Sequence, residues 1–120
     1  MEYDAADGLS QPVLRSCSPR EEVLSEALEC VMKSRNNDYG PPDQDFTRTA
    51  AIWTALFGPK LRADAAFDGK DVALAMIALK LSRACWADKR DNFVDAAGYA
   101  ACGWECAVRD EERQNAAAQE

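Results

Sequence analysis

The chain contains no histidine, and this absence removes several common catalytic and metal-binding arrangements. A histidine general base, a Ser-His-Asp triad and any histidine-ligated zinc site are all excluded. Any catalysis by this protein must therefore depend on carboxylates, Lys, Tyr, Cys or a bound metal ion.

The cysteines lack the pattern of a disulfide framework or of a cysteine-only zinc site. The chain has five cysteines, an odd number, and no C-x-x-C motif. Cys102 and Cys106 lie one helical turn apart, a spacing that does not suit a disulfide within a regular helix. We expect the cysteines to be reduced and to serve as small core residues of a cytoplasmic protein.

Long apolar runs and excess positive charge are also missing. No run reaches the roughly 18 residues of a membrane span, and the first twenty residues are too polar for a signal peptide, so we expect no membrane partner. The net charge of −7 disfavours generic DNA or RNA binding, because phosphates would be repelled. A small phosphorylated ligand stays possible, since it needs only a local cation, a helix N-terminus or a metal.

Helical periodicity dominates the sequence, and no stretch alternates with the period of two that is typical of strands. With 48% hydrophobic residues, the 120 residues can form the core of one domain. We predict an all-α, four-helix bundle-like fold over residues 18–113. A flexible arm at 1–17 and a frayed tail at 114–120 are expected to flank it.

Capping residues mark the expected start of the first helix. Ser18 and Glu21 form a capping-box pattern, with a proline at the first helical position. The apolar spacing that follows predicts a helix ending near Ser34. Gly40 and two prolines predict a loop over 35–42.

Three further helices are expected along the rest of the chain. Asp43 is the predicted cap of the second, which a Gly-Pro pair ends, and Phe67 is expected to plug the connection that follows. Asp68 is the predicted cap of the third. Residues 72–81 are apolar almost all round, so we expect that helix to be buried on most sides.

The fourth helix carries two different faces. Asp91, Asp95 and Tyr99 follow one another at intervals of four and share one face. The Ala, Gly and Cys residues of 96–103 are small enough to let another helix approach closely. That helix could be the third one or, with Trp104 beside the run, a helix of a second subunit.

The third and fourth helices should be antiparallel neighbours because the turn between them is short. Lys80 and Arg83 can then face Asp91 and Asp95. One interpretation is a structural ion-pair network. The other is a Mg²⁺ site in which these aspartates bind the metal while the two cations steady a polyphosphate.

Two other groups of polar residues have alternative interpretations. Glu26 and Glu29 form an ExxE pair that either faces a metal or belongs to a solvated acidic stripe. Arg35, Asp38 and Tyr39 lie in the expected loop, where they either bind a ligand or cap a turn.

Four linked motifs resemble a family of small phage and prophage proteins that contain a domain of unknown function. The motifs are Arg35…Asp38-Tyr39-Gly40-x-Pro42…Phe46, Ala50-Ala51-x-Trp53, Asp71-Val72-Ala73-x-x-Met76…Leu79-Lys80-x-x-Arg83 and Asp91-x-x-x-Asp95-x-Ala97-Gly98-Tyr99-Ala100. The resemblance covers roughly residues 30 to 104.

More distantly, the layout is similar to the MazG-like all-α nucleoside triphosphate pyrophosphohydrolases. That resemblance implies an oligomeric helical enzyme using Mg²⁺ and an ExxE…ExxD carboxylate set. Glu26 and Glu29 match the first half in spacing. Asp91 and Asp95 would have to supply the second half, with one residue more between them.

Three functions follow as hypotheses. The first is a Mg²⁺-dependent nucleotide pyrophosphohydrolase whose metal is held by Glu26, Glu29, Asp91 and Asp95. The second is a module that sequesters a nucleotide, such as a host defence signal, without turnover. The third is a structural or interaction protein. For the first two, the nucleotide-binding residues are expected to be Arg35, Asp38, Tyr39, Trp53, Lys80, Arg83 and Tyr99, with Tyr39 or Trp53 stacking on the base.

Overall fold

The computed structural model describes residues 18–119, and these residues form only helices, turns and short connections. The all-α prediction is therefore confirmed for this part of the chain. No helix in it is long and apolar enough to cross a lipid bilayer. The elements are α1 (Pro19–Glu29), the π-helical segment η2 (Cys30–Ser34), α2 (Arg35–Tyr39), α3 (Pro42–Phe57), the 3₁₀ segment η3 (Gly58–Lys60), α4 (Gly69–Trp86) and α5 (Arg90–Ala118).

The first helical run starts as predicted but continues further than predicted. The Ser18 hydroxyl accepts a hydrogen bond from the Glu21 N–H (3.2 Å), and the Glu21 carboxylate accepts one from the Ser18 N–H (3.0 Å). The run does not end near Ser34, because η2 and α2 carry it to Tyr39. The loop predicted over 35–42 is wrong for 35–39, since the helix ends only at Gly40, which has φ +83°.

The next two helix starts show one wrong cap and one confirmed cap. Helix α3 begins at Pro42, and Asp43 lies in its first turn and does not cap it. A proline suits the first helical position, because its missing N–H would have no partner there. Asp68 caps α4 as predicted: its carboxylate accepts from the Asp71 N–H (2.8 Å), and Asp71 accepts in return from the Asp68 N–H (3.0 Å).

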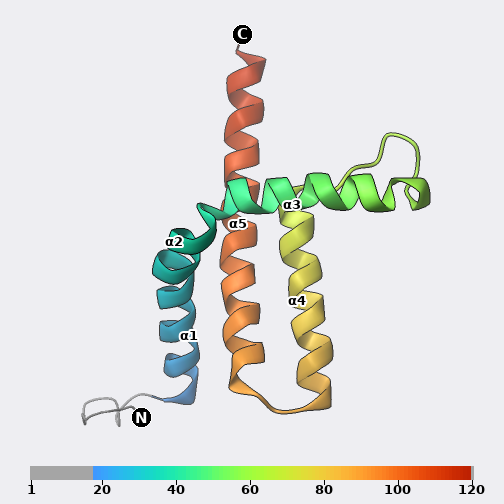
Figure 1. The fold of residues 1–120 in the computed structure, drawn as a ribbon. Helices are drawn as coiled ribbons and strands as arrows, with labels where there is room; N and C mark the ends of the chain where they lie inside the picture. The colour runs from blue at the N-terminus through green and yellow to red at the C-terminus, as the bar shows by residue number, and fades with distance from the viewer. Residues whose placement is uncertain (1–17, 120) are drawn as a thin grey trace.

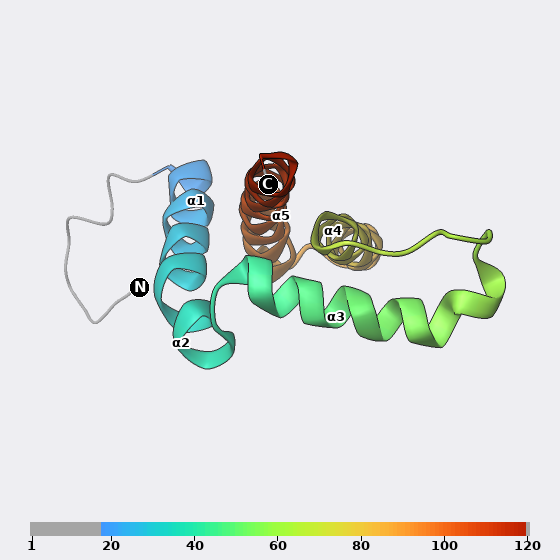
Figure 2. The same cartoon turned by 90° about the horizontal axis from the view of Figure 1, so that it is seen from above.

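Helix α5 lies in the middle of a row formed by α1, α5 and α4, and α3 crosses the row on one side (Figure 1 and Figure 2). Helices α4 and α5 are antiparallel neighbours, as predicted. The expected bundle of four aligned helices is not formed, because α3 runs across the others and extends beyond α4 (Figure 1). Phe67 closes the connection after α3. Its ring packs edge-on against that of Trp53, with 5.9 Å between the two ring centres.

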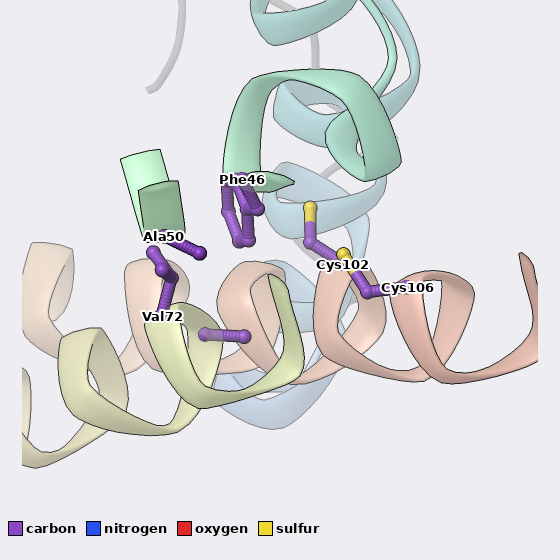
Figure 3. Packing of buried hydrophobic residues seen from close by; sticks show 6 residues of the cluster. Phe46, Ala50, Val72, Cys102 and Cys106 are labelled. Carbon is purple, nitrogen blue, oxygen red and sulfur yellow. The ribbon is translucent and has the colours of Figure 1, made fainter. Parts of the chain in front are cut away.

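The buried core lies where α3 crosses α4 and α5 (Figure 3). It is small, and its members are Phe46, Ala50, Val72, Ala73, Cys102 and Cys106. Gly103 brings α5 unusually close to α4, because a Cβ atom at this position would lie 2.9 Å from the Ala73 Cβ. The small residues predicted to form a close helix contact do so here, within one chain.

Helix α4 is less covered than its composition predicted. Only Gly69, Val72 and Ala73 are buried, whereas Leu74 and Leu81 are 55% and 58% exposed. The prediction of burial on most sides is wrong for this chain alone, because α5 covers one side of α4 and α3 covers only its first turns (Figure 1). At the other end of the chain, α5 continues to Ala118 through residues with good helix propensity.

Candidate functional site

Three aromatic rings surround the guanidinium of Arg35. Its central carbon lies 5.0 Å from the ring centre of Tyr99, 5.3 Å from that of Phe46 and 5.6 Å from that of Tyr39. These distances suit cation–π contacts, which attract a cation without neutralising it. The Arg35 side chain forms no ion pair within residues 18–119, and its buried Nε has no hydrogen-bond partner there. We call this arrangement the arginine cage.

The π-helical segment η2 turns Arg35 toward these rings. The Arg35 N–H donates to the Cys30 carbonyl, five residues back, so the turn holds one residue more than a regular α-helical turn. Arg35 therefore occupies the angular position that residue 34 would have in an uninterrupted helix. That position is seven residues after the buried Ala27, on the face of the helical run that meets α5.

A small open pocket lies beside the arginine cage, between the first helical run and α5. Its empty volume, mouth included, is about 270 Å³. The residues that line it are Cys30, Val31, Arg35, Val94, Asp95, Gly98 and Tyr99. Only about 30 Å³ of this space is open to the centre of a water-sized molecule, which is too little to enclose a nucleotide. A phosphate would therefore meet Arg35 at the mouth of the pocket.

The four carboxylates predicted as metal ligands all influence the ionisation of the Cys30 thiol. Burial raises the pKa of the Cys30 thiol, and Glu26, Asp95, Glu29 and Asp91 raise it further. Three of them also have cationic partners. Lys80 contacts Asp95 at 2.8 Å, Lys33 contacts Glu29 at 3.6 Å, and Arg90 pairs with Glu26.

These carboxylates do not converge as a metal centre in this arrangement. Within the described residues, no three Asp, Glu or Cys side chains form a group that could hold a metal ion. Ion pairing explains this in part, since Lys33, Lys80 and Arg90 draw carboxylates toward separate cations. The arrangement is that of a salt-bridge network with acidic character, next to an arginine that has no acidic partner among residues 18–119.

Most of the other residues expected to bind a ligand lie away from the pocket. Lys80 does not line the pocket but contacts Asp95, which does. Asp38 and Arg83 are exposed and are not among the residues that line the pocket. Trp53 packs against Phe67, so its position does not support base stacking near Arg35.

Sequence reasoning missed several residues that shape the site. Phe46 was not among the predicted ligand-binding residues, yet it forms one wall of the arginine cage as well as part of the core. Gly98 lets η2 and α5 approach, because a Cβ atom there would lie 3.2 Å from a Val31 methyl group. The signal for Phe46 was its helical spacing, but only the π turn brings Arg35 to it.

The core thiols of Cys102 and Cys106 should be far less reactive than the thiol of Cys85 at the end of α4. Burial raises the pKa of Cys102, and it raises that of Cys106 from 9.0 to about 12. The thiolate is the reactive form, so these core thiols should be inert at neutral pH. Cys85, by contrast, is exposed.

Alkylation should therefore separate the cysteines. With iodoacetamide at pH 8, we expect Cys106 to react at least about 100-fold more slowly than Cys85, as measured by peptide mass spectrometry. In urea the two rates should become similar, and similar rates in the folded protein would contradict the described burial.

The raised pKa of Cys106 also predicts how stability depends on pH. Because the Cys106 thiol loses its proton at lower pH in the unfolded chain than in the folded one, the free energy of unfolding should fall as pH rises from 9.0 toward about 12.

The fold and the site together define a small all-helical domain in which a caged arginine lies beside a carboxylate cluster. The chain belongs to the family described as a domain of unknown function, DUF6378, whose sequence profile matches residues 22–107. The matched range contains the arginine cage, the carboxylates and the core.

Two relatives are phage proteins. The Gene 55 protein of Mycobacterium phage D29 is 33% identical over 83 residues, which cover 68% of this chain and 51% of that protein. The Gene 55 protein of Mycobacterium phage L5 is 34% identical over 79 residues, covering 65% and 47%. The chain thus spans about half the length of these relatives, and no solved structure matches it significantly. The resemblance to a phage family of unknown function is confirmed.

Proposed function

We propose that this protein binds the phosphate groups of a nucleotide at the arginine cage. One observation carries the proposal: the Arg35 guanidinium is held by three aromatic rings at the edge of a pocket and forms no ion pair within the described residues. A guanidinium presents several N–H donors in a planar fork that matches phosphate oxygens. The rings fix the fork without consuming its charge, so it stays available to an anionic ligand.

The carboxylates near the pocket restrict which anion can bind. Glu26, Glu29, Asp91 and Asp95 would repel a free phosphate, and the ion pairs of Lys33, Lys80 and Arg90 offset that repulsion only in part. A nucleotide that carries Mg²⁺ lowers its own negative charge and is therefore the ligand we expect. The place of action that we propose is the host-cell cytoplasm, where such nucleotides are abundant.

A binding screen tests the proposal. Isothermal titration calorimetry of linear and cyclic nucleotides, pyrophosphate and phosphate, each with and without Mg²⁺, should detect binding that Arg35→Gln weakens about 10- to 100-fold. Arg62→Gln is the matched control. Arg62 is exposed in the connection before α4, and its substitution removes the same charge away from the arginine cage. The proposal fails if the wild-type protein binds none of these compounds, or if Arg35→Gln binds as tightly as the control.

A pyrophosphohydrolase is the second candidate, favoured by four carboxylates whose charges all act on the Cys30 thiol. In this proposal Glu26, Glu29, Asp91 and Asp95 would hold Mg²⁺, which would supply charge neutralisation and an activated water. Their existing ion pairs with Arg90, Lys33 and Lys80 do not fit a ready metal centre. Catalysis would require those pairs to open, whereas binding at Arg35 would not.

Pyrophosphate release from nucleoside triphosphates with Mg²⁺ distinguishes the two candidates. An enzyme should lose at least about 100-fold in kcat with Asp95→Asn, a change that keeps the side-chain shape but removes the charge. Equal turnover by Asp95→Asn and the wild-type protein would exclude the metal assignment. Binding without pyrophosphate release would indicate a protein that sequesters its nucleotide.

A further inference from the structure

The face of the α4–α5 pair opposite α3 is apolar and uncovered within residues 18–119. Val72 and Cys102 belong to the core beneath α3, and the next residues, Ala73 and Gly103, meet between the two helices. The residues after those, Leu74 and Trp104, are one further step of about 100° round each helix. They consequently point away from α3, and they are 55% and 72% exposed.

Apolar residues continue along this face of both helices. On α5, Phe93, Ala97, Ala100 and Trp104 follow at intervals of four, three and four residues. On α4, Leu74 and Leu81 lie seven residues apart with Ala78 between them. Such intervals are those of a helix-pairing seam, and no charged side chain falls within either series. We call this surface the back face.

The series on α5 is symmetric about its own centre. Read in either direction, the order is large, small, small, large: Phe93, Ala97, Ala100 and Trp104. Two copies of α5 crossing antiparallel would place Phe93 against Trp104 of the other copy and Ala97 against Ala100. A surface that complements itself in this way fits the two-fold axis of a homodimer.

The exposed area is also of the right size. Phe93 and Trp104 are 52% and 72% exposed, and Leu74 and Leu81 are 55% and 58% exposed. These residues expose roughly 100–200 Å² each, and with the alanines between them they approach the ~800 Å² per partner of a standard stable interface. A patch this large is unusual on a monomer whose own core is so small.

We propose that two copies of this chain form a homodimer back to back, with α5 crossing α5 of the partner subunit antiparallel and α4 flanking the contact. The dimer would bury the back face and complete the core that one chain lacks. It would leave the pocket open, because Asp95 and Tyr99 lie on a different face of α5.

Light scattering at micromolar concentration tests the dimer. The wild-type protein should have twice the 13.2 kDa mass of one chain, and Ala100→Glu should be monomeric because it places two charges at the crossing point. Ala116→Glu is the control on the exposed end of the same helix and should remain dimeric. A monomeric wild-type protein, or a dimeric Ala100→Glu protein, would overturn the proposal.

Cysteine cross-linking tests the antiparallel register and does not depend on the folding of Ala100→Glu. In a background with Cys17 and Cys85 replaced by serine, mixed Phe93→Cys and Trp104→Cys chains should form a disulfide between one chain of each type. This heterodimer keeps one native Phe93–Trp104 pair. Each variant alone should not cross-link, because equal positions lie roughly 16 Å apart along the crossed helices. Cross-linking within a single variant, and none in the mixture, would refute the register.

Discussion

Replacing Phe46 with alanine should lower the free energy of unfolding by about 3–5 kcal/mol, enough to unfold most of a marginally stable protein. Phe46 is 2% exposed and is the largest side chain of a core that otherwise contains Ala, Val and Cys residues. Large, partly buried side chains such as Met76 and Tyr99 pack against this core, but they would fill the cavity left by the ring only in part. Urea denaturation followed by circular dichroism, at a fixed protein concentration, measures the loss.

Phe46→Leu separates the two roles of the ring. Leucine retains most of the apolar volume, so the stability loss should stay below about 1.5 kcal/mol. It removes the π system that faces Arg35 at 5.3 Å, and nucleotide affinity should consequently fall although the protein stays folded. A loss below 1 kcal/mol for Phe46→Ala would show that the core is not centred on this residue.

Local signals in the sequence predicted local structure well. The capping box at Ser18 was visible as a spacing of three residues, and Asp68 was predicted as a cap; both are present, each as a pair of hydrogen bonds. A cap depends on residues within one turn, so tertiary contacts rarely override it. The antiparallel α4–α5 pair was likewise predictable, because a short turn leaves the chain no other arrangement.

The arginine cage could not be predicted, because it depends on a π turn. Residues 30–34 carry no Gly or Pro that would signal an irregular turn, whereas Gly40 and the two prolines after it led to the prediction of a loop at Arg35. One extra residue in a turn rotates everything after it by about 100°. That rotation changes Arg35 from a loop residue into the centre of three rings contributed by α2, α3 and α5.

Helix α4 shows a different limit of sequence reasoning. Its apolar composition predicted burial on most sides, but composition does not say which chain would cover the helix. Within one chain α5 covers one side, and Leu74 and Leu81 remain exposed. The homodimer would reconcile the sequence with the structure, since the predicted burial would then be supplied by the partner subunit.

Helix α5 makes three different contacts with three different faces of the same stretch, residues 93–104. Asp95 and Tyr99 face the pocket, Gly103 faces α4, and Phe93 and Trp104 face outward. The family match at residues 22–107 includes all three faces and ends before the exposed last turns of the helix. A substitution on one face should thus change one property first, which makes the faces separable by mutation.

Gly103→Val should give the second large loss of stability, about 3 kcal/mol, with a fall in Tm of more than about 10 °C. Even one added methyl group would lie 2.9 Å from the Ala73 Cβ, and neither atom can move unless a helix moves with it. The better helix propensity of valine over glycine recovers only a few tenths of a kcal/mol. Helices α4 and α5 would have to separate along the contact that supports the core.

Gln114→Val provides the matched control for this substitution. It introduces the same side chain on an exposed part of α5, beyond the contact with α4, and should shift Tm by only a few degrees. Differential scanning calorimetry at one fixed protein concentration compares the two variants. If Gly103→Val melts within a few degrees of Gln114→Val, α4 and α5 do not approach as closely at residue 103 as the structure describes.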